Sequence, residues 1–175
     1  MILDVKSRSE AERVNDLTVP HLIVSIRDPD APPANPKQTA LTKAVLFRAF
    51  DDLDKQPGAS TIAYLGREAQ LFAASDAEAI CQAVLDTRPE GVIAHCEAGI
   101  SRSAGVAAAL AAFFNGDDSD YFATRGYSAG RYAPNMLVYG TLLYTLVSWR
   151  PKFVRVGMQP QLTETLVVER YAKLR

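Results

Sequence analysis

The sequence predicts an α/β protein in which a central, mostly parallel β-sheet is flanked by helices. Strand-like segments alternate with helix-like segments in the N-terminal part of the chain, and helix-like segments then dominate. The chain has 175 residues, of which 48% are hydrophobic and 22% charged. That length and composition suit a single folded domain with a sizeable buried core.

The first elements predicted are two strands separated by a helix. Apolar residues favour a short strand at 2–5 and a longer strand at 21–26. Residues 7–14 between them have a helical pattern, with Ser7 as the N-cap and Glu10 three residues later, as in a capping box. The alternation of strands and helices begins here.

Loops rich in proline and aspartate surround the third predicted strand. The segment 27–36, RDPDAPPANP, contains too much proline for regular structure. Residues 44–50 favour a strand, and the acidic loop 51–54 follows it. No pattern assigns a structure to residues 55–70, which begin with the turn-like sequence KQPGAS.

The centre of the chain predicts a helix, a buried strand and a second helix. Residues 75–87 carry apolar side chains at helical spacing, and Ser75 is the expected N-cap. The short apolar run 91–94 is typical of a buried strand. Residues 101–114 are apolar nearly all round, so we expect that helix to be covered by other elements and to end at Gly116.

Helices dominate the rest of the chain. The patterns predict helices at 117–125 and 135–149, and Pro151 is expected to close the second of them. A terminal helix is expected at 163–173. No internal repeat and no low-complexity segment occurs in the sequence.

Charge and cysteine content exclude several classes of protein. The formal net charge is −1 and no basic block is present, which disfavours nucleic acid as a partner. Two cysteines, Cys81 and Cys96, are too few for a disulfide framework and suit a reducing compartment. Neither a signal-peptide pattern nor an apolar run of ~20 residues is present, so no membrane association is expected. We expect a cytoplasmic monomer with a single domain over 1–175, its core at about 20–150 and an extension at 151–175.

The segment VIAHCEAGISRSAG, residues 92–105, passes from an apolar strand into a helix of small residues. Such a turn directs backbone N–H groups and the positive end of the helix toward one point, where they bind an anion such as phosphate. Gly99 allows the backbone to approach closely, and Arg102 adds a planar fork that grips two phosphate oxygens. Helix N-termini and nearby cations lower a thiol pKa from ~8.5 to roughly 3.5–7.5. We therefore expect Cys96 to be a thiolate that attacks phosphorus.

The sequence HCEAGISRS within this segment resembles the H-C-x5-R-S/T signature of the cysteine-dependent protein tyrosine and dual-specificity phosphatases. Five residues fall on signature positions: His95, Cys96, Gly99, Arg102 and Ser103. The resemblance covers about residues 20–150. It implies the α/β fold of the dual-specificity phosphatases, hydrolysis through a phosphocysteine intermediate, and no metal or other cofactor.

The resemblance also implies a role for each residue of the turn. Cys96 would be the nucleophile, Arg102 would bind the phosphoryl oxygens, and Ser103 would donate a hydrogen bond to the Cys96 sulfur. His95 would form a hydrogen bond within the loop and keep it rigid. Backbone amides would surround the phosphate at Glu97, Ala98, Gly99, Ile100, Ser101 and Arg102.

A general acid is needed to protonate the leaving oxygen, and the family uses an aspartate on an upstream loop. One candidate loop carries Asp28 and Asp30, and the other carries Asp51, Asp52 and Asp54. The run AFDDLD resembles the Phe-Asp-Asp loop of compact members such as the regenerating-liver phosphatases, whose second aspartate is the acid. This resemblance favours Asp52, followed by Asp51. The spacing from Asp52 to Cys96 is longer than usual, and residues 55–70 would fill it as a lid or rim.

The run YAPNMLVYG resembles the Pro-Asn helix start of dual-specificity members. There the asparagine braces the acid loop and the phosphate loop, so the resemblance implies that role for Asn135. A simple N-cap of an apolar helix explains the same residue, and the two interpretations are compatible.

Phosphotyrosine in proteins, with phosphoserine or phosphothreonine as further substrates, is the favoured substrate class. Phosphoinositides or small phosphorylated metabolites are the alternative, although Glu97 disfavours a highly charged inositol headgroup. A rhodanese-like sulfurtransferase also uses a cysteine within a loop of backbone amides, and a non-catalytic phosphate-binding module would need no nucleophile. These interpretations remain open from the sequence.

Overall fold

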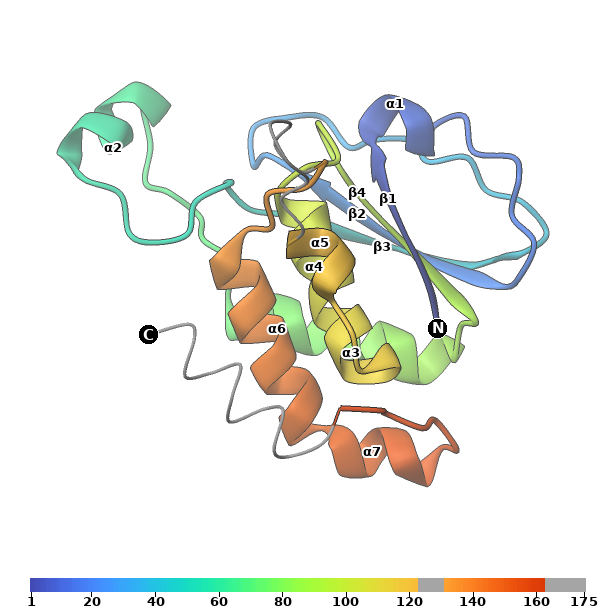
Figure 1. Ribbon diagram of the computed structural model, residues 1–175. Helices are drawn as coiled ribbons and strands as arrows, with labels where there is room; N and C mark the ends of the chain where they lie inside the picture. The colour runs from blue at the N-terminus through green and yellow to red at the C-terminus, as the bar shows by residue number, and fades with distance from the viewer. Residues whose placement is uncertain (123–130, 163–175) are drawn as a thin grey trace.

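A four-stranded sheet forms the centre of the protein in the computed structural model, which describes residues 1–122 and 131–162. The strand order is β1-β4-β2-β3, and every neighbouring pair is parallel (Figure 1). The strands are β1 (Ile2–Ser7), β2 (His21–Arg27), β3 (Thr42–Ala49) and β4 (Gly91–Cys96). The prediction of an α/β fold with a central parallel sheet flanked by helices is confirmed.

Helices α3, α4 and α6 lie together on one face of the sheet (Figure 1). Apolar side chains from these helices and from β2 and β4 form the main core. The helices are α1 (Arg8–Ala11), α2 (Ala59–Leu65), α3 (Ala74–Thr87), α4 (Arg102–Leu110), the π-helical turn η1 (Ala111–Asn115), α5 (Ser119–Phe122), α6 (Met136–Ser148) and α7 (Arg150–Arg155).

The strand β4 and the helix α4 are the most enclosed elements, as their continuous apolar patterns predict. Every residue of both is buried. The small residues of α4 let α6 pack closely: a Cβ atom on Gly105 would lie only 2.8 Å from the carbonyl oxygen of Asn135. This close crossing holds the start of α6 beside the start of α4.

The chain after α1 covers the opposite face of the sheet. Ser7 caps α1 in the predicted capping box, because its hydroxyl accepts from the Glu10 amide and its own amide donates to the Glu10 carboxylate. The helix ends at Ala11, earlier than the predicted residue 14. Val14 instead packs against Ile23 and Ile93 on the sheet, so burial of this side chain limits the helix.

Two helices differ from their predicted limits for local reasons. Helix α3 begins at Ala74 with Ala73 as its N-cap, and the expected cap Ser75 lies inside the helix. The Asp76 carboxylate accepts the Ala73 amide at 3.0 Å, which satisfies the helix start without a capping hydroxyl. The helix predicted at 101–114 is α4 followed by η1, and its end at Gly116, with φ of 74°, is confirmed.

The C-terminal elements are shorter than predicted in the described residues. The helix expected at 117–125 is α5, and the end of the predicted range lies outside the described residues, as does the helix expected at 163–173. Pro151 lies in the first turn of α7, where proline suits the unpaired helix start, instead of only closing α6. None of the helices in residues 1–122 and 131–162 has the length and apolar character that crossing a membrane requires.

Candidate active site

The turn between β4 and α4, residues 96–102, is called the anion loop below. Backbone hydrogen bonds tie it to the neighbouring elements. The Arg8 amide donates to the Glu97 carbonyl at 3.2 Å, and the Ala133 amide donates to the Ile100 carbonyl at 3.0 Å. The amides of Gly105 and Asn135 both donate to the Ser101 carbonyl, at 2.8 and 3.2 Å. These bonds fix the carbonyl groups of the loop, while the amides of Gly99 and Ile100 lie within hydrogen-bonding reach of the Cys96 sulfur.

Gly99 is required at the tightest point of the anion loop. Its φ of 70° lies in the left-handed region, which a residue with a side chain rarely adopts. A Cβ atom here would also lie 2.6 Å from backbone atoms of Lys6 and Ser7 at the end of β1. Both the backbone conformation and the contact with β1 therefore exclude a larger residue.

The Cys96 thiol lies at the end of β4, directly under the anion loop. Burial raises its pKa, but hydrogen bonds from the Ser103 hydroxyl and from the amides of Ser103, Gly99 and Ile100 outweigh burial and lower the pKa overall. The Cys96 Sγ and Ser103 Oγ atoms are 3.1 Å apart. Cys96 is therefore a buried group whose surroundings favour the thiolate.

Arg102 lies at the first turn of α4 and is only 4% exposed. Its Nη1 atom donates to the Asp28 carboxylate at 2.7 Å and to the Phe50 carbonyl at 2.9 Å. Its buried Nε atom forms no hydrogen bond in the described part of the chain and is 3.8 Å from the Asp52 carboxylate. The guanidinium thus lies between the carboxylates of Asp28 and Asp52.

Asp52 joins the anion loop to the start of α6. Its Oδ1 atom accepts from the Ser101 hydroxyl at 2.7 Å and from the Asn135 side-chain amide at 3.0 Å. Asn135 is also the N-cap of α6, where its side-chain oxygen accepts the Val138 amide at 3.0 Å. Asn135 therefore makes both the capping contact and the bracing contact that the sequence left as alternatives.

Asp51 has different surroundings from Asp52, although the two residues are adjacent. Arg67 holds both Asp51 carboxylate oxygens at 2.8 Å, and the Gln70 amide adds a third bond at 2.8 Å. The Arg67 guanidinium is the largest cause that lowers the pKa of Asp51. Such a carboxylate is a poor proton donor, so Asp52 is the better candidate for the general acid.

His95 precedes Cys96 on β4 and is completely buried. Among the described residues neither ring nitrogen has a hydrogen-bond partner, which differs from the bond expected within the loop. The side chain of a residue before Cys96 points to the other face of the sheet, away from the anion loop. Burial lowers the pKa of His95 to about 4, only partly opposed by the Cys96 backbone, so the ring is neutral.

The other loop side chains point outward. Glu97, Ala98 and Ile100 are exposed, and the Glu97 carboxylate lies 3.7 Å from the Arg8 guanidinium. Their contribution to a bound anion is therefore limited to their backbone amides.

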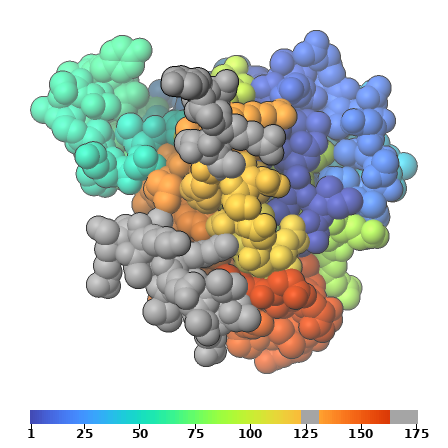
Figure 2. Space-filling model, in the orientation of Figure 1, coloured from blue at the N-terminus to red at the C-terminus, as the bar shows by residue number. Residues whose placement is uncertain are grey.

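A hollow of about 330 Å³ lies beside the candidate acid and is lined mainly by carboxylates and by α2. Its lining residues are Asp28, Asp30, Asp51, Asp52, Leu53, Thr61, Tyr64, Leu65 and Arg67. Figures 1 and 2 show that α2 stands away from the sheet and its covering helices, and none of its residues is buried. Thr61, Tyr64, Leu65 and Arg67 therefore form a projecting wall of the hollow.

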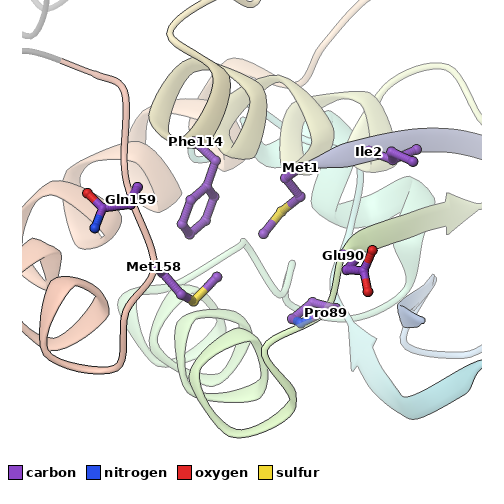
Figure 3. Close-up of a pocket in the computed structure, with 7 residues that line it drawn as sticks. All are labelled: Met1, Ile2, Pro89, Glu90, Phe114, Met158 and Gln159. Carbon is purple, nitrogen blue, oxygen red and sulfur yellow. The ribbon is translucent and has the colours of Figure 1, made fainter. Parts of the chain in front are cut away.

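A second cavity, of about 390 Å³, lies at the opposite end of the sheet. Met1, Met158 and Phe114 lie around it beside the starts of β1 and β4 (Figure 3). It contains none of the candidate site residues, because the anion loop follows the carboxyl end of β4. The candidate site residues are therefore gathered at the anion loop and the acidic hollow.

Sequence reasoning did not single out Arg67. It lies in residues 55–70, which have no periodic pattern, so no signal distinguished it from a solvated surface residue. Asp28 was considered only as a less favoured acid, and its contact with Arg102 spans 74 positions. Contacts of this kind depend on the tertiary fold.

Comparison with protein families and with curated protein sequences gives no match. Among solved structures, the chain is similar to the crystal structure of human tyrosine phosphatase-like serine/threonine/tyrosine-interacting protein. The identity is 20%, the match covers 87% of this chain and 93% of that chain, and the TM-score is 0.42. The geometry of the site itself therefore carries the functional proposal.

Proposed function

We propose that the protein is a cysteine-dependent phosphatase that hydrolyses phosphotyrosine in proteins, and phosphoserine or phosphothreonine in addition, through a phosphocysteine intermediate. One observation carries this proposal. A buried thiol with a lowered pKa lies beneath a turn of backbone amides, and the buried guanidinium of Arg102 begins the helix that follows. A thiolate, an anion-binding turn and a fixed positive charge are the groups that phosphoryl transfer to sulfur requires.

In the first step, Cys96 Sγ attacks the phosphorus of the bound ester. A sulfur–phosphorus bond forms while the bond from phosphorus to the ester oxygen breaks, and the protonated Asp52 gives its proton to that oxygen. Loop amides and Arg102 stabilise the charge on the other phosphoryl oxygens. Asp28, which holds Arg102 at 2.7 Å, must yield its position when a phosphoryl oxygen approaches that nitrogen.

In the second step, water attacks the phosphocysteine. The Asp52 carboxylate takes a proton from that water, the sulfur–phosphorus bond breaks, and inorganic phosphate leaves. Ser103 lies 3.1 Å from the sulfur, where its hydroxyl can donate to the departing thiolate. No cofactor is required in this scheme, because the loop, Arg102 and Asp52 supply the charges and the proton.

The acidic hollow supports a phosphorylated protein over a phosphoinositide or another highly phosphorylated molecule. Four aspartates and one arginine line it, so additional phosphates near the scissile ester would be repelled. Leu53, Leu65 and the exposed Tyr64 offer apolar surface to an aromatic leaving group and its neighbouring residues. The rhodanese-like alternative has no comparable use for an aspartate held over the anion loop. A cytoplasmic, reducing environment would keep Cys96 reduced.

The test is hydrolysis of phosphotyrosine peptides by the wild-type protein, Cys96→Ser and the control Cys81→Ala. We expect the wild type and the control to release phosphate, and acid quenching during turnover to trap phosphate on Cys96. Thiosulfate:cyanide transfer should be absent. Phosphate release that survives Cys96→Ser would contradict the proposal, and so would sulfur transfer without ester hydrolysis.

A further inference from the structure

We propose that Arg67 is a positioning residue for the general acid Asp52; this inference rests on the proposed function. Arg67 projects from the segment between the acid loop and α3, and its side chain is 20% exposed. Its bonds, taken together, connect the two loops that place carboxylates beside Arg102.

The Arg67 guanidinium uses all three of its nitrogen atoms. The Nη1 and Nη2 atoms each donate to one Asp51 oxygen at 2.8 Å, which is a bidentate pair. The Nε atom donates to Asp30 at 2.6 Å, and Nη1 also reaches the Glu68 carbonyl at 2.9 Å. Each of these acceptors lies outside the anion loop, so Arg67 acts on the chemistry through its partners.

The partners of Arg67 are sequence neighbours of the two carboxylates at Arg102. Asp51 directly precedes Asp52, and Asp30 follows Asp28 by two residues. Arg102 pairs with Asp28 and lies near Asp52. Arg67 pairs with Asp30 and Asp51, the sequence neighbours of those two carboxylates. The same two loops are therefore joined twice, once at the reacting centre and once by Arg67.

Asp51, which Arg67 holds, also fixes the backbone that leads into Asp52. Its amide donates to the Gln70 carbonyl at 2.7 Å, its carboxylate accepts the Gln70 amide, and its carbonyl accepts the Leu53 amide at 2.9 Å. Asp52 is thus held through its side chain by Ser101 and Asn135 and through its backbone by the Arg67–Asp51 pair. Loss of Arg67 would free only the second of these attachments.

Arginine is required for this arrangement, because its planar fork satisfies two oxygens of one carboxylate and still reaches a second carboxylate. A lysine at position 67 would keep the charge but lose the bidentate geometry. We therefore expect Arg67→Lys to retain part of the wild-type behaviour and Arg67→Met to retain little of it.

The experiment measures kcat/KM for a series of aryl phosphates, from acidic nitrophenols to tyrosine, with Arg67→Met, Arg67→Lys and Asp52→Asn. Lys55→Met is the matched control, since it removes a positive charge from an exposed position on the same segment. We expect Arg67→Met to lose about 10- to 100-fold with tyrosine phosphate but less than about threefold with the most acidic phenol. Combining Arg67→Met with Asp52→Asn should add little further loss, and Lys55→Met should behave as wild type.

Other outcomes separate this inference from the proposed function. If Arg67→Met loses activity equally across the series, or if Arg67→Met and Arg67→Lys both match the wild type, Arg67 does not position the acid. That result overturns the inference alone as long as Asp52→Asn shows the selective loss. If the wild type hydrolyses none of the esters, the proposed function and this inference are both wrong. The alkylation rate of Cys96 provides a folding check, because Arg67→Met should leave it unchanged at every pH.

Discussion

The protein contains two cysteines that are almost equally buried and chemically opposite. Cys96 is 2% exposed and Cys81 is completely enclosed. Hydrogen bonds lower the pKa of Cys96 in spite of its burial, whereas burial raises the pKa of Cys81 to about 12. Burial alone therefore does not decide whether a thiol is reactive.

The difference lies in which backbone amides are free near each sulfur. Cys81 lies inside α3, on the buried side that also carries Ile80 and Val84. The helix uses the surrounding amides for its own hydrogen bonds. Cys96 ends a strand, and amides of the turn that follows, those of Gly99 and Ile100, donate to its sulfur. The thiol pKa is lowered at Cys96 because the chain changes from strand to helix around it.

The largest expected effect comes from replacing each of the two cysteines in turn. Cys96→Ser should lower kcat on the order of 10⁴-fold or more, as removal of a catalytic nucleophile does in other enzymes. Cys81→Ala should leave kcat unchanged and lower the free energy of unfolding by about 1 kcal/mol, because only a small buried group is lost. Steady-state kinetics and urea unfolding on both variants measure the contrast. A comparable loss of kcat in Cys81→Ala would contradict the distinction between the two cysteines.

The shape of the turn can be broken at Gly99. We expect Gly99→Ala to lower the free energy of unfolding by about 2 to 5 kcal/mol, because a left-handed φ and a clash with β1 add together. Gly157→Ala is the matched control: its φ of 83° is also left-handed, but no atom lies within 4 Å of the new Cβ. That control should lose only about 1 to 2 kcal/mol. Equal losses in urea unfolding would show that the contact with β1 is unimportant.

The residue next to Cys96 sharpens the comparison, because His95 is completely buried and burial dominates its pKa. The pKa of His95 falls from 6.5 to about 4 on folding, so between these pH values the unfolded chain binds a proton that the folded chain does not. The free energy of unfolding should therefore decrease by about 3 kcal/mol in total as the pH falls through this range. Replacing His95 with leucine should remove this contribution, so the variant should lose about that much less than wild type between pH 7.5 and pH 4. Parallel losses in the two proteins would contradict the expectation.

Ser103 provides the smallest of these effects. Ser103→Ala removes one hydrogen bond to the thiolate and should raise the pKa of Cys96. The acidic limb of the profile of kcat/KM against pH should therefore move to higher pH, because less thiolate is present at low pH. Ser148→Ala, at the far end of α6, is the control and should leave the profile in place. An unchanged acidic limb in Ser103→Ala would mean that the backbone amides alone set the thiol pKa.

Much of the fold follows from the sequence because its strands and long helices have clear apolar periods. The runs that became β2 and β4 are continuous and buried, and the capping box at Ser7 is a local signal. Helix α2 escaped prediction since it buries no residue and has no side-chain cap. The turn η1 has the same apolar residues as the end of an α-helix, so a pattern cannot separate the two.

The candidate site divides in the same way. Cys96, Arg102 and Ser103 lie within one continuous segment, so their proximity follows from local geometry. The contacts of Arg102 with Asp28 and of Arg67 with Asp30 span 74 and 37 positions. They depend on how the segments after β2, β3 and β4 come together, which residue spacing does not reveal. Asp51 and Asp52 are adjacent in the sequence, and only their tertiary partners distinguish them.

The central claim is that the anion loop lowers the pKa of the buried Cys96 thiol below its ordinary value. The direct measurement is the rate at which iodoacetamide alkylates each cysteine as a function of pH, followed by peptide mass spectrometry of the native protein. We expect alkylation of Cys96 with a midpoint well below the ordinary thiol pKa of ~8.5, while Cys81 stays unmodified throughout. A midpoint for Cys96 at or above ~8.5 would contradict the account.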